Sequence, residues 1–202
     1  MSRVLPRLLL VALALALAAC AGRAPPRLDA AEHERAQRER EAWIAAQLDW
    51  SLHGRLAVSD GEDSGSGQLD WEVSPTQTRF EFRAPVSRRA WRLIARPGHA
   101  VLEGLDDGPR HGSDAARLLE ETIGWSLPLA DLAAWARGAR GDGPARIEYA
   151  ASGLPARIIQ AGWTIEYRDW HARQTPPLPR RVFAQRGEQR VRLVVESWNA
   201  SP

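Results

Sequence analysis

The chain has 202 residues, and all 27 of its basic residues are arginine, against 25 acidic residues. Because it contains no lysine, it lacks both the lysine of a nucleotide-binding P-loop and a Schiff-base amine, and its single cysteine excludes an internal disulfide, a CxxC redox pair and a cysteine-rich zinc site. Arg3 and Arg7 lie in a predicted leader, and without them 25 arginines balance the acidic residues, which argues against general nucleic-acid binding. The length indicates one domain.

The first 19 residues have the layout of a secretory signal peptide. Residues 1–7 carry two arginines and no acidic residue, and residues 8–18 are leucine, valine and alanine, a run too short to span a bilayer comfortably. The segment Leu17–Cys20 resembles a bacterial lipobox, in which the cysteine becomes the first residue of the mature chain and carries a diacylglycerol and a further acyl chain. We therefore predict a signal peptide over residues 1–19 and lipidation at Cys20. Since two or more acyl chains anchor a protein stably, the lipidated chain is expected to stay on the membrane.

The segment after the cysteine is predicted to be a lipid-anchored tether over residues 20–28. Ala21 and Gly22 follow the cysteine, whereas an aspartate there marks inner-membrane retention in enterobacteria. By analogy we expect the chain to lie on the periplasmic face of the outer membrane, as a monomer with no nucleic-acid partner.

The remaining residues, 29–202, are expected to form a single domain that begins with a helix. Residues 29–48 are rich in alanine, glutamate, arginine and glutamine, and the pairs Glu34–Arg38 and Arg35–Glu39 have the i,i+4 spacing that supports a helix. We expect most of this helix to be solvated, because its apolar side chains are confined to Ala42, Trp43, Ile44 and Leu48.

From Trp50 onward apolar and polar residues alternate with a period of two, which predicts strands with one wet and one dry face. The alternating apolar positions are Trp50, Leu52, Gly54, Leu56 and Val58; Leu69, Trp71 and Val73; Phe80 and Phe82; Ile147 and Tyr149; Trp163, Ile165 and Tyr167; and Val191, Leu193 and Val195. Turn signals containing glycine or proline separate these runs at short intervals. The pattern is typical of a mainly β protein whose antiparallel sheet curls or closes.

Two short helices are predicted in the middle of the chain. Ser113 is placed to cap the first helix, and Gly124 to end it. The second is expected over Leu129–Arg137, opened by Pro128. Their apolar faces are Ala115, Leu118, Leu119, Thr122 and Ile123 in the first helix, and Leu129, Leu132 and Trp135 in the second. Since they cannot be part of the sheet, they must cover a face or an opening.

The dry face of the sheet is the candidate binding site. Two interpretations are open: an ordinary packed core, or a curved sheet around a cavity that holds an elongated apolar ligand. Two short helices cannot bury a whole sheet face, which favours the cavity. Its candidate residues are Trp50, Leu52, Leu56, Leu69, Trp71, Phe80, Phe82, Trp91, Leu93, Leu132, Trp135, Trp163, Ile165, Tyr167, Leu193 and Val195.

A second candidate site is the tip of a predicted hairpin over residues 84–89. Strand-like segments flank it on both sides, and Pro85, Val86 and Ser87 form its apex. An apolar tip followed by Arg88 and Arg89 has the composition to contact lipid, with the arginines near the head groups.

Taken together, these residues resemble the LolB family of outer-membrane lipoproteins. The similarity runs from Trp43 to Asn199, nearly the whole chain after the tether. Its matching segments are Gly54–Val58, Arg96–Gly98, Gly124–Leu129 with Trp135 and Gly138, Ile147–Tyr149, Gly162–Tyr167, Pro177–Pro179 and Val191–Trp198.

The resemblance implies an incomplete antiparallel β-barrel with a short helical lid, which closes over the acyl chains of a lipoprotein cargo. It implies that the cargo comes from a LolA-like periplasmic carrier and is inserted into the outer membrane without a cofactor. It also implies a membrane-insertion loop at Pro85, Val86 and Ser87. The family commonly has Pro-Leu-Gly there, so Val86 presents less apolar area than leucine.

Other functions have little support in the sequence. The segment 60–65 is similar to a calcium loop, but the twelfth position is Trp71 rather than glutamate. The five histidines have no metal-binding spacing and no nucleophile motif is present, so we predict no metal site and no catalytic residue. The rival hypotheses are a structural lipoprotein of an envelope assembly with a solid β core and, with the least support, a lipid- or glycan-acting enzyme.

Overall fold

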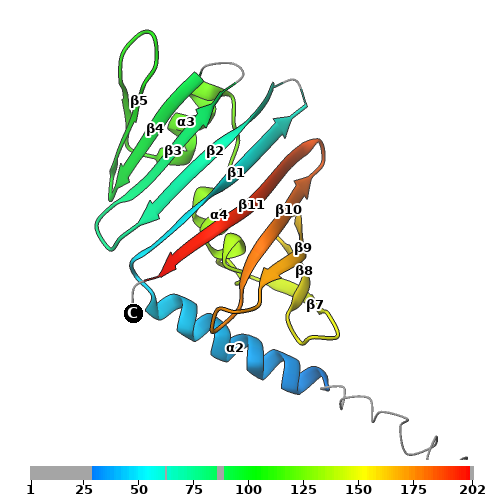
Figure 1. The fold of residues 1–202 in the computed structure, drawn as a ribbon. Coiled ribbons are helices and arrows are strands. Elements are labelled where there is room, and N and C mark those ends of the chain that lie inside the picture. The colour runs from blue at the N-terminus through cyan, green and yellow to red at the C-terminus, as the bar shows by residue number, and fades with distance from the viewer. Residues whose placement is uncertain (1–28, 62, 86–88, 201–202) are drawn as a thin grey trace, which may run out of the picture.

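The computed structural model describes residues 29–61, 63–85 and 89–200. The predicted signal peptide, Cys20 and most of the tether therefore lie outside the described residues, as do Val86 and Ser87. Figure 1 shows one large curved sheet with helices on one side. The strands are β1 (Trp50–Asp60), β2 (Asp63–Val73), β3 (Thr78–Ala84), β4 (Arg89–Arg96), β5 (His99–Glu103), β6 (Arg110–Gly112), β7 (Ala145–Tyr149), β8 (Pro155–Gln160), β9 (Trp163–His171), β10 (Leu178–Arg186) and β11 (Gln189–Ala200). The helices are α2 (Ala30–Ala46), α3 (Ala115–Ile123) and α4 (Leu129–Ala136).

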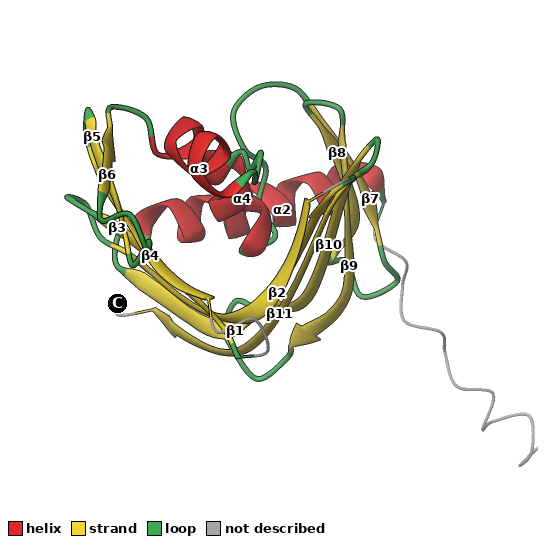
Figure 2. Ribbon diagram, turned by 90° about the horizontal axis from the view of Figure 1, so that it is seen from above, coloured by secondary structure: helices red, strands yellow, loops and turns green. Residues whose placement is uncertain are grey.

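All eleven strands form a single antiparallel sheet that stays open. Its strand order is β6-β5-β4-β3-β2-β1-β11-β10-β9-β8-β7, so β6 and β7 are its two edges. The sheet curves into a half-barrel, and α3 and α4 lie inside the curve (Figure 2). This confirms the predicted fold class, an incomplete barrel with a helical lid and an N-terminal helix.

The first and last strands pair in the middle of the sheet. β1 pairs along its whole length with β11, from Trp50 opposite Ala200 to Asp60 opposite Gln189. The register shifts by one residue at Gly54, which marks a β-bulge. A side chain at this position would meet the opposite backbone, because a Cβ would lie 2.2 Å from the carbonyl oxygen of Val194. Glycine is therefore required for the close approach of the two central strands.

The helices α3 and α4 form the connection between the two edges of the sheet. They follow β6 and precede β7, so the chain must cross the concave face to reach the opposite edge. The predicted N-cap at Ser113 is wrong by one residue: the side chain of Asp114 accepts the hydrogen bond from the backbone N–H of Arg117 at 2.7 Å. Gly124 ends α3 in the left-handed conformation as predicted, with a φ of 81°.

One side of the N-terminal helix α2 is buried, and most of the buried side chains on it are polar. Asp29 and Glu32 form a capping box at its start. The side chains of Gln37, Arg40 and Ile44 are buried, whereas Leu48, which was expected on its apolar face, is 60% exposed. The expectation that α2 is mostly solvated therefore fails on one side, because that side packs against the segment that follows α4.

The hairpin turns define two rims of the half-barrel. We call the upper rim the end that carries the turns β1–β2, β3–β4, β8–β9 and β10–β11, which lies at the top of Figure 1. The lower rim carries the turns β2–β3, β4–β5 and β9–β10, and α2 crosses near it. The pairing of Ala84 with Arg89 on the upper rim confirms that β3 and β4 form the predicted hairpin. Within the described residues, no helix is both long and apolar enough to cross a membrane.

We predict that Gly54→Ala destabilises the fold by about 1–3 kcal/mol, because the added methyl group overlaps the backbone of β11. Chemical denaturation with urea measures this loss. Gly112→Ala is the matched control, since a Cβ there would lie at an ordinary 3.5 Å from Leu118. Equal losses in the two variants would show that Gly54 does not set the spacing of the central strands.

Candidate functional site

The residues that we predicted from the sequence to line a cavity lie together on the concave face of the sheet. All sixteen belong to one buried cluster, and each is at most 7% exposed. Trp71, Trp135 and Trp163 are among the largest fully buried side chains. The inward phase predicted for these sixteen residues is therefore confirmed, whereas a role in binding acyl chains stays a prediction.

Aromatic rings form a continuous row across the strands β1 to β4. Trp71 lies 5.2 Å from Trp50 and 5.2 Å from Phe80, both in edge-on contact. The row continues through Trp91, which stacks on Phe80 at 5.7 Å and on Phe82 at 5.3 Å. Because each ring is held by its neighbours, this half of the concave face is a rigid apolar wall.

The connection between α3 and α4 inserts Trp125 into this wall. Its ring meets Phe82 at 5.0 Å and Trp91 at 5.5 Å, both edge-on. Gly65 makes room for it, since a Cβ at that position would lie 2.5 Å from the ring. The list of candidate site residues missed Trp125 and its buried neighbour Leu127, which lie in a loop without periodicity. The signal that could have found them is the density of apolar residues between Gly124 and Pro128.

The helix α4 is fixed to the other half of the sheet by buried hydrogen bonds. The indole N–H of Trp135 donates to Oε1 of Gln160 in β8 at 2.9 Å, and the hydroxyl of Tyr167 in β9 donates to the carbonyl of Trp135 at 2.9 Å. Burial raises the pKa of Tyr167 far above its usual range, so its hydroxyl stays a donor. Trp135 also contacts Trp163, with ring centres 5.8 Å apart.

The segment after α4 is held by polar side chains of α2. Gln37 donates to the carbonyl of Gly138 at 3.1 Å, and Arg40 donates to the carbonyl of Arg137 at 2.6 Å. In return Arg137 donates to the carbonyl of Ile44 at 3.0 Å, near the end of α2. Burial lowers the pKa of Arg40 and of Arg137 to about 10, which leaves both charged at neutral pH.

An ion pair completes this attachment. Arg140 contacts Glu34 at 2.8 Å and Glu41 at 2.6 Å, so that two carboxylates of α2 hold the loop after α4. We call the contacts of α2 with residues 137–140 the α2 clasp. The lid therefore has two attachments, Trp125 on one arm of the sheet and the hydrogen bonds of α4 and the clasp on the other.

A pocket opens beside the lid on the upper rim. It measures about 670 Å³ and lies between α3 and the strands β2 to β4. Phe82, Trp91 and Trp125 form its apolar wall, and Ala84 and Arg89, which flank the tip of the β3–β4 hairpin, form its outer edge. Deeper in the concave face Leu132 and Trp135 are 2% and 0% exposed, so the lid itself fills that space.

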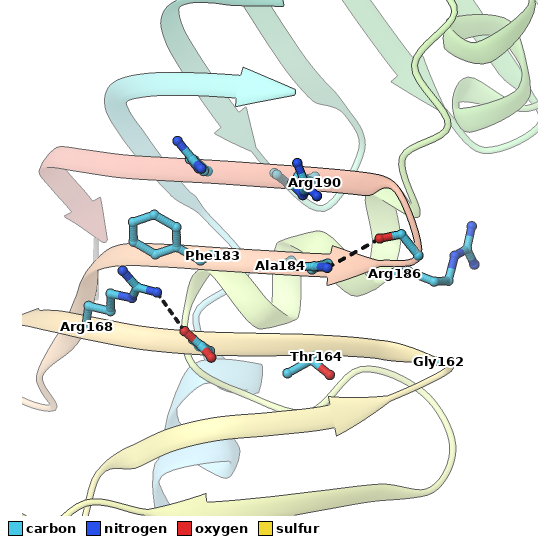
Figure 3. A pocket seen from close by; sticks show the side chains of 12 residues that line it. Gly162, Thr164, Arg168, Phe183, Ala184, Arg186 and Arg190 are labelled. Atoms are coloured by element: carbon cyan, nitrogen blue, oxygen red, sulfur yellow. Dashed lines mark hydrogen bonds and ion pairs between the residues drawn. The ribbon is translucent and has the colours of Figure 1, made fainter. Parts of the chain in front are cut away.

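The opposite, convex face is polar. A pocket of about 510 Å³ on the strands β9 to β11 is lined by Arg168, Arg186, Arg190 and Arg192 around Phe183 (Figure 3). Arg168 lies over the ring of Phe183 at 4.3 Å and pairs with Glu166 at 3.0 Å. Since charged side chains surround this pocket, it does not suit a hydrocarbon chain. The apolar site is therefore confined to the concave face.

Comparison with known proteins identifies the relatives of this chain. Residues 48–198 match the family model described as outer membrane lipoprotein LolB. A protein of Xanthomonas campestris pv. campestris (strain 8004) named outer-membrane lipoprotein LolB is 39% identical over the full length of both chains. A protein of the same name from Xanthomonas oryzae pv. oryzae (strain MAFF 311018) is 41% identical over 81% of this chain and 78% of the relative. Among solved structures, a DUF1329 family protein of Desulfovibrio piger has the same fold, with a TM-score of 0.53, 7% identity and coverage of 83% and 92%.

We predict that Trp125→Ala loosens the lid and lowers the free energy of unfolding by about 3–5 kcal/mol, since it empties a buried indole site. Urea unfolding measures the loss, and hydrogen exchange of the amides in residues 115–136 measures the loosening. Trp43→Ala is the control, because Trp43 in α2 is only half-buried and does not contact the lid's aromatic wall. Lid amides that stay as protected as those of the central strands would contradict the role of Trp125.

Proposed function

The chain belongs to the LolB family of outer-membrane lipoproteins, and we propose that it receives lipoproteins from a LolA-like periplasmic carrier and passes them to the outer membrane. In this proposal the acyl chains of the cargo lie against the concave face, under α3 and α4. The observation that carries it is the large apolar concave face of the sheet. Two short helices and their connection cover this face, and no second sheet packs on it among the described residues.

The chemistry of the concave face suits hydrocarbon chains. Each methylene group that leaves water contributes about 0.8 kcal/mol, so long acyl chains gain much from such a surface. In the closed arrangement Trp125, Leu127, Leu132 and Trp135 take up the same surface. Opening the lid exposes apolar wall, and an entering acyl chain covers it again, so binding of cargo offsets the cost of opening.

The pocket beside the lid is the proposed mouth. Its wall of Phe82, Trp91 and Trp125 leads into the buried cluster, and its outer edge adjoins the β3–β4 hairpin. Acyl chains that leave here emerge at Ala84 and Arg89, which flank in sequence the proposed membrane-insertion loop, Pro85, Val86 and Ser87. The mouth and the loop on one rim together support delivery of the chains directly into lipid.

The proposed anchor is the acylated Cys20. Eight residues, 21–28, separate it from Asp29 at the start of α2, and the nine Cα–Cα steps of an extended chain span at most about 30 Å. Such a tether would keep the domain close to the membrane while leaving it free to turn its upper rim toward the lipid. In this proposal residues 1–19 are the signal peptide and residues 29–202 form one domain.

Transfer along this route needs no covalent chemistry and no cofactor. A cargo that binds two surfaces with different free energies moves to the better one, and about 1.4 kcal/mol gives a tenfold bias. The final step is favoured because a bilayer surrounds acyl chains completely, whereas a half-barrel encloses them on one side and a lid on the other.

A structural lipoprotein of an envelope assembly is the second candidate. The observation that favours it is the filled interior, in which Leu132, Trp135 and Trp163 are at most 2% exposed. In that case the lid is a permanent part of the core, and no acyl chain displaces it. Binding of an acyl probe separates the two functions.

We predict saturable binding of a fluorescent fatty acid to the chain. Ala84→Trp should weaken it by about tenfold, or 1.4 kcal/mol, because Ala84 lies on the concave side of β3 and lines the mouth, so that an indole there fills it. Fluorescence titration measures the affinity. Ala57→Trp is the matched control, since Ala57 lines a pocket on the convex face. Absence of saturable binding to the unaltered chain would favour the structural function.

We predict that Val86→Glu slows the insertion of cargo into liposomes by about tenfold and leaves transfer from the carrier intact, because a carboxylate resists entry into lipid. Reconstituted transfer with a labelled lipoprotein separates the two steps. Thr76→Glu places the same charge in an exposed turn on the lower rim and serves as control. Equal insertion rates for Val86→Glu and the unaltered chain would remove the hairpin from the mechanism.

A further inference from the structure

Two tryptophans of the concave face bury an indole N–H that has no hydrogen-bond acceptor. Nε1 of Trp71 and Nε1 of Trp163 have no hydrogen-bond partner among residues 29–61, 63–85 and 89–200, and each side chain is 1% exposed. Two other buried tryptophans have acceptors: Trp135 donates to Gln160 at 2.9 Å and Trp198 to the carbonyl of Pro179 at 2.9 Å. Because buried donors in proteins are nearly always paired, an unpaired one calls for an explanation.

The neighbours of Trp71 offer one. It meets the rings of Trp50 and Phe80 edge-on at 5.2 Å, with interplanar angles of 61° and 63°, an arrangement in which an N–H can face an aromatic ring. It also lies near the lower rim, opposite Leu52 in β1. This indole belongs to the rigid wall.

Trp163 has no such arrangement. Its one aromatic contact is with Trp135, tilted by 51° at 5.8 Å. The nearby amide oxygen of Gln160 already accepts from Trp135 and from the backbone N–H of Gly141 at 2.8 Å. Among the described residues, the donor of Trp163 is therefore left without an acceptor, on the concave side of β9 and beside Trp135 of α4.

The position and the charge around Trp163 point to a polar ligand. It is the first residue of β9, so it lies at the upper rim, where the proposed mouth also opens. Arg186, which also lines the convex pocket, is the last residue of β10, and its guanidinium lies over the ring of Trp163 at 5.0 Å. A cation on the ring face draws electron density from the indole and makes its N–H a better donor. Arg186 itself donates only Nε, to Gln189 at 3.0 Å, among the described residues.

We propose that Trp163 and Arg186 form a carbonyl-binding site for the acyl linkages of the cargo. A lipoprotein carries two ester carbonyls on its diacylglycerol and an amide carbonyl on its N-acyl chain, and an oxygen of this kind is the acceptor that the indole lacks. The tails would then lie deeper on the apolar face, while the linkage is held at the rim. This inference rests on the proposed function and adds to it a preference for ester- or amide-linked chains over bare hydrocarbon.

The test compares two fluorescent probes of equal chain length, a diacylglycerol and the matching dialkylglycerol ether, which lacks the carbonyls. All proteins carry Cys20→Ser, so that no acyl chain of their own competes. The unaltered site should prefer the ester. Trp163→Phe should reduce the ratio of ester to ether affinity by about three- to tenfold, the usual worth of one hydrogen bond. The ratio is the readout because loss of ring volume affects both probes equally.

Trp71→Phe is the matched control, since it removes a second unpartnered indole N–H from the same face, and its ratio should stay unchanged. Arg186→Gln should lower the ratio in part and Arg186→Lys should preserve it, which gives a second test if Trp163→Phe folds poorly. An unchanged ratio in Trp163→Phe and Arg186→Gln, or an equal fall in Trp71→Phe, would overturn the carbonyl site alone. Failure of both probes to bind the unaltered chain would instead overturn the proposed function.

Discussion

The pairing of β1 with β11 is the constraint on which the rest of the structure depends. It places the first and last strands at the centre of the sheet, so the two edges, β6 and β7, are neighbours in the chain but lie at opposite sides of the half-barrel. The chain between them must cross from one edge to the other. On the convex side the crossing would cover charged side chains, whereas on the concave side it buries apolar ones, so α3 and α4 form the lid.

The two faces of the sheet then have different tasks. Arginines and carboxylates on the convex face pair across strands, as Arg83 does with Asp70 at 3.0 Å, and such exposed pairs add little stability but keep this face solvated. On the concave face, Trp125 and Trp135 of the lid are buried against the sheet, at 3% and 0% exposed. In the proposed function, lid and ligand compete for this one surface, and the strength of the lid contacts sets the affinity for cargo.

In the proposed function, the α2 clasp connects the membrane anchor to this competition. The helix that follows the tether holds the segment after α4 through Gln37, Arg40 and the ion pairs of Arg140. These contacts are polar and partly buried, and each of them must find water or another partner when α4 moves. The helix nearest the anchor thus bears directly on the free energy of lid opening.

The sequence by itself determined most of the strands, the inward phase of their buried residues and the glycine that ends α3, because alternation and capping depend on residues close together in the chain. It also carried the family resemblance, which the relatives bear out. Only the tertiary structure decided the central pairing of β1 with β11, the insertion of Trp125 beside Gly65, and the burial of Gln37 and Arg40 in a helix that looked solvated. Each of these features joins segments that are distant in sequence. The periodicity of apolar residues along one segment does not indicate which distant segment its side chains will contact.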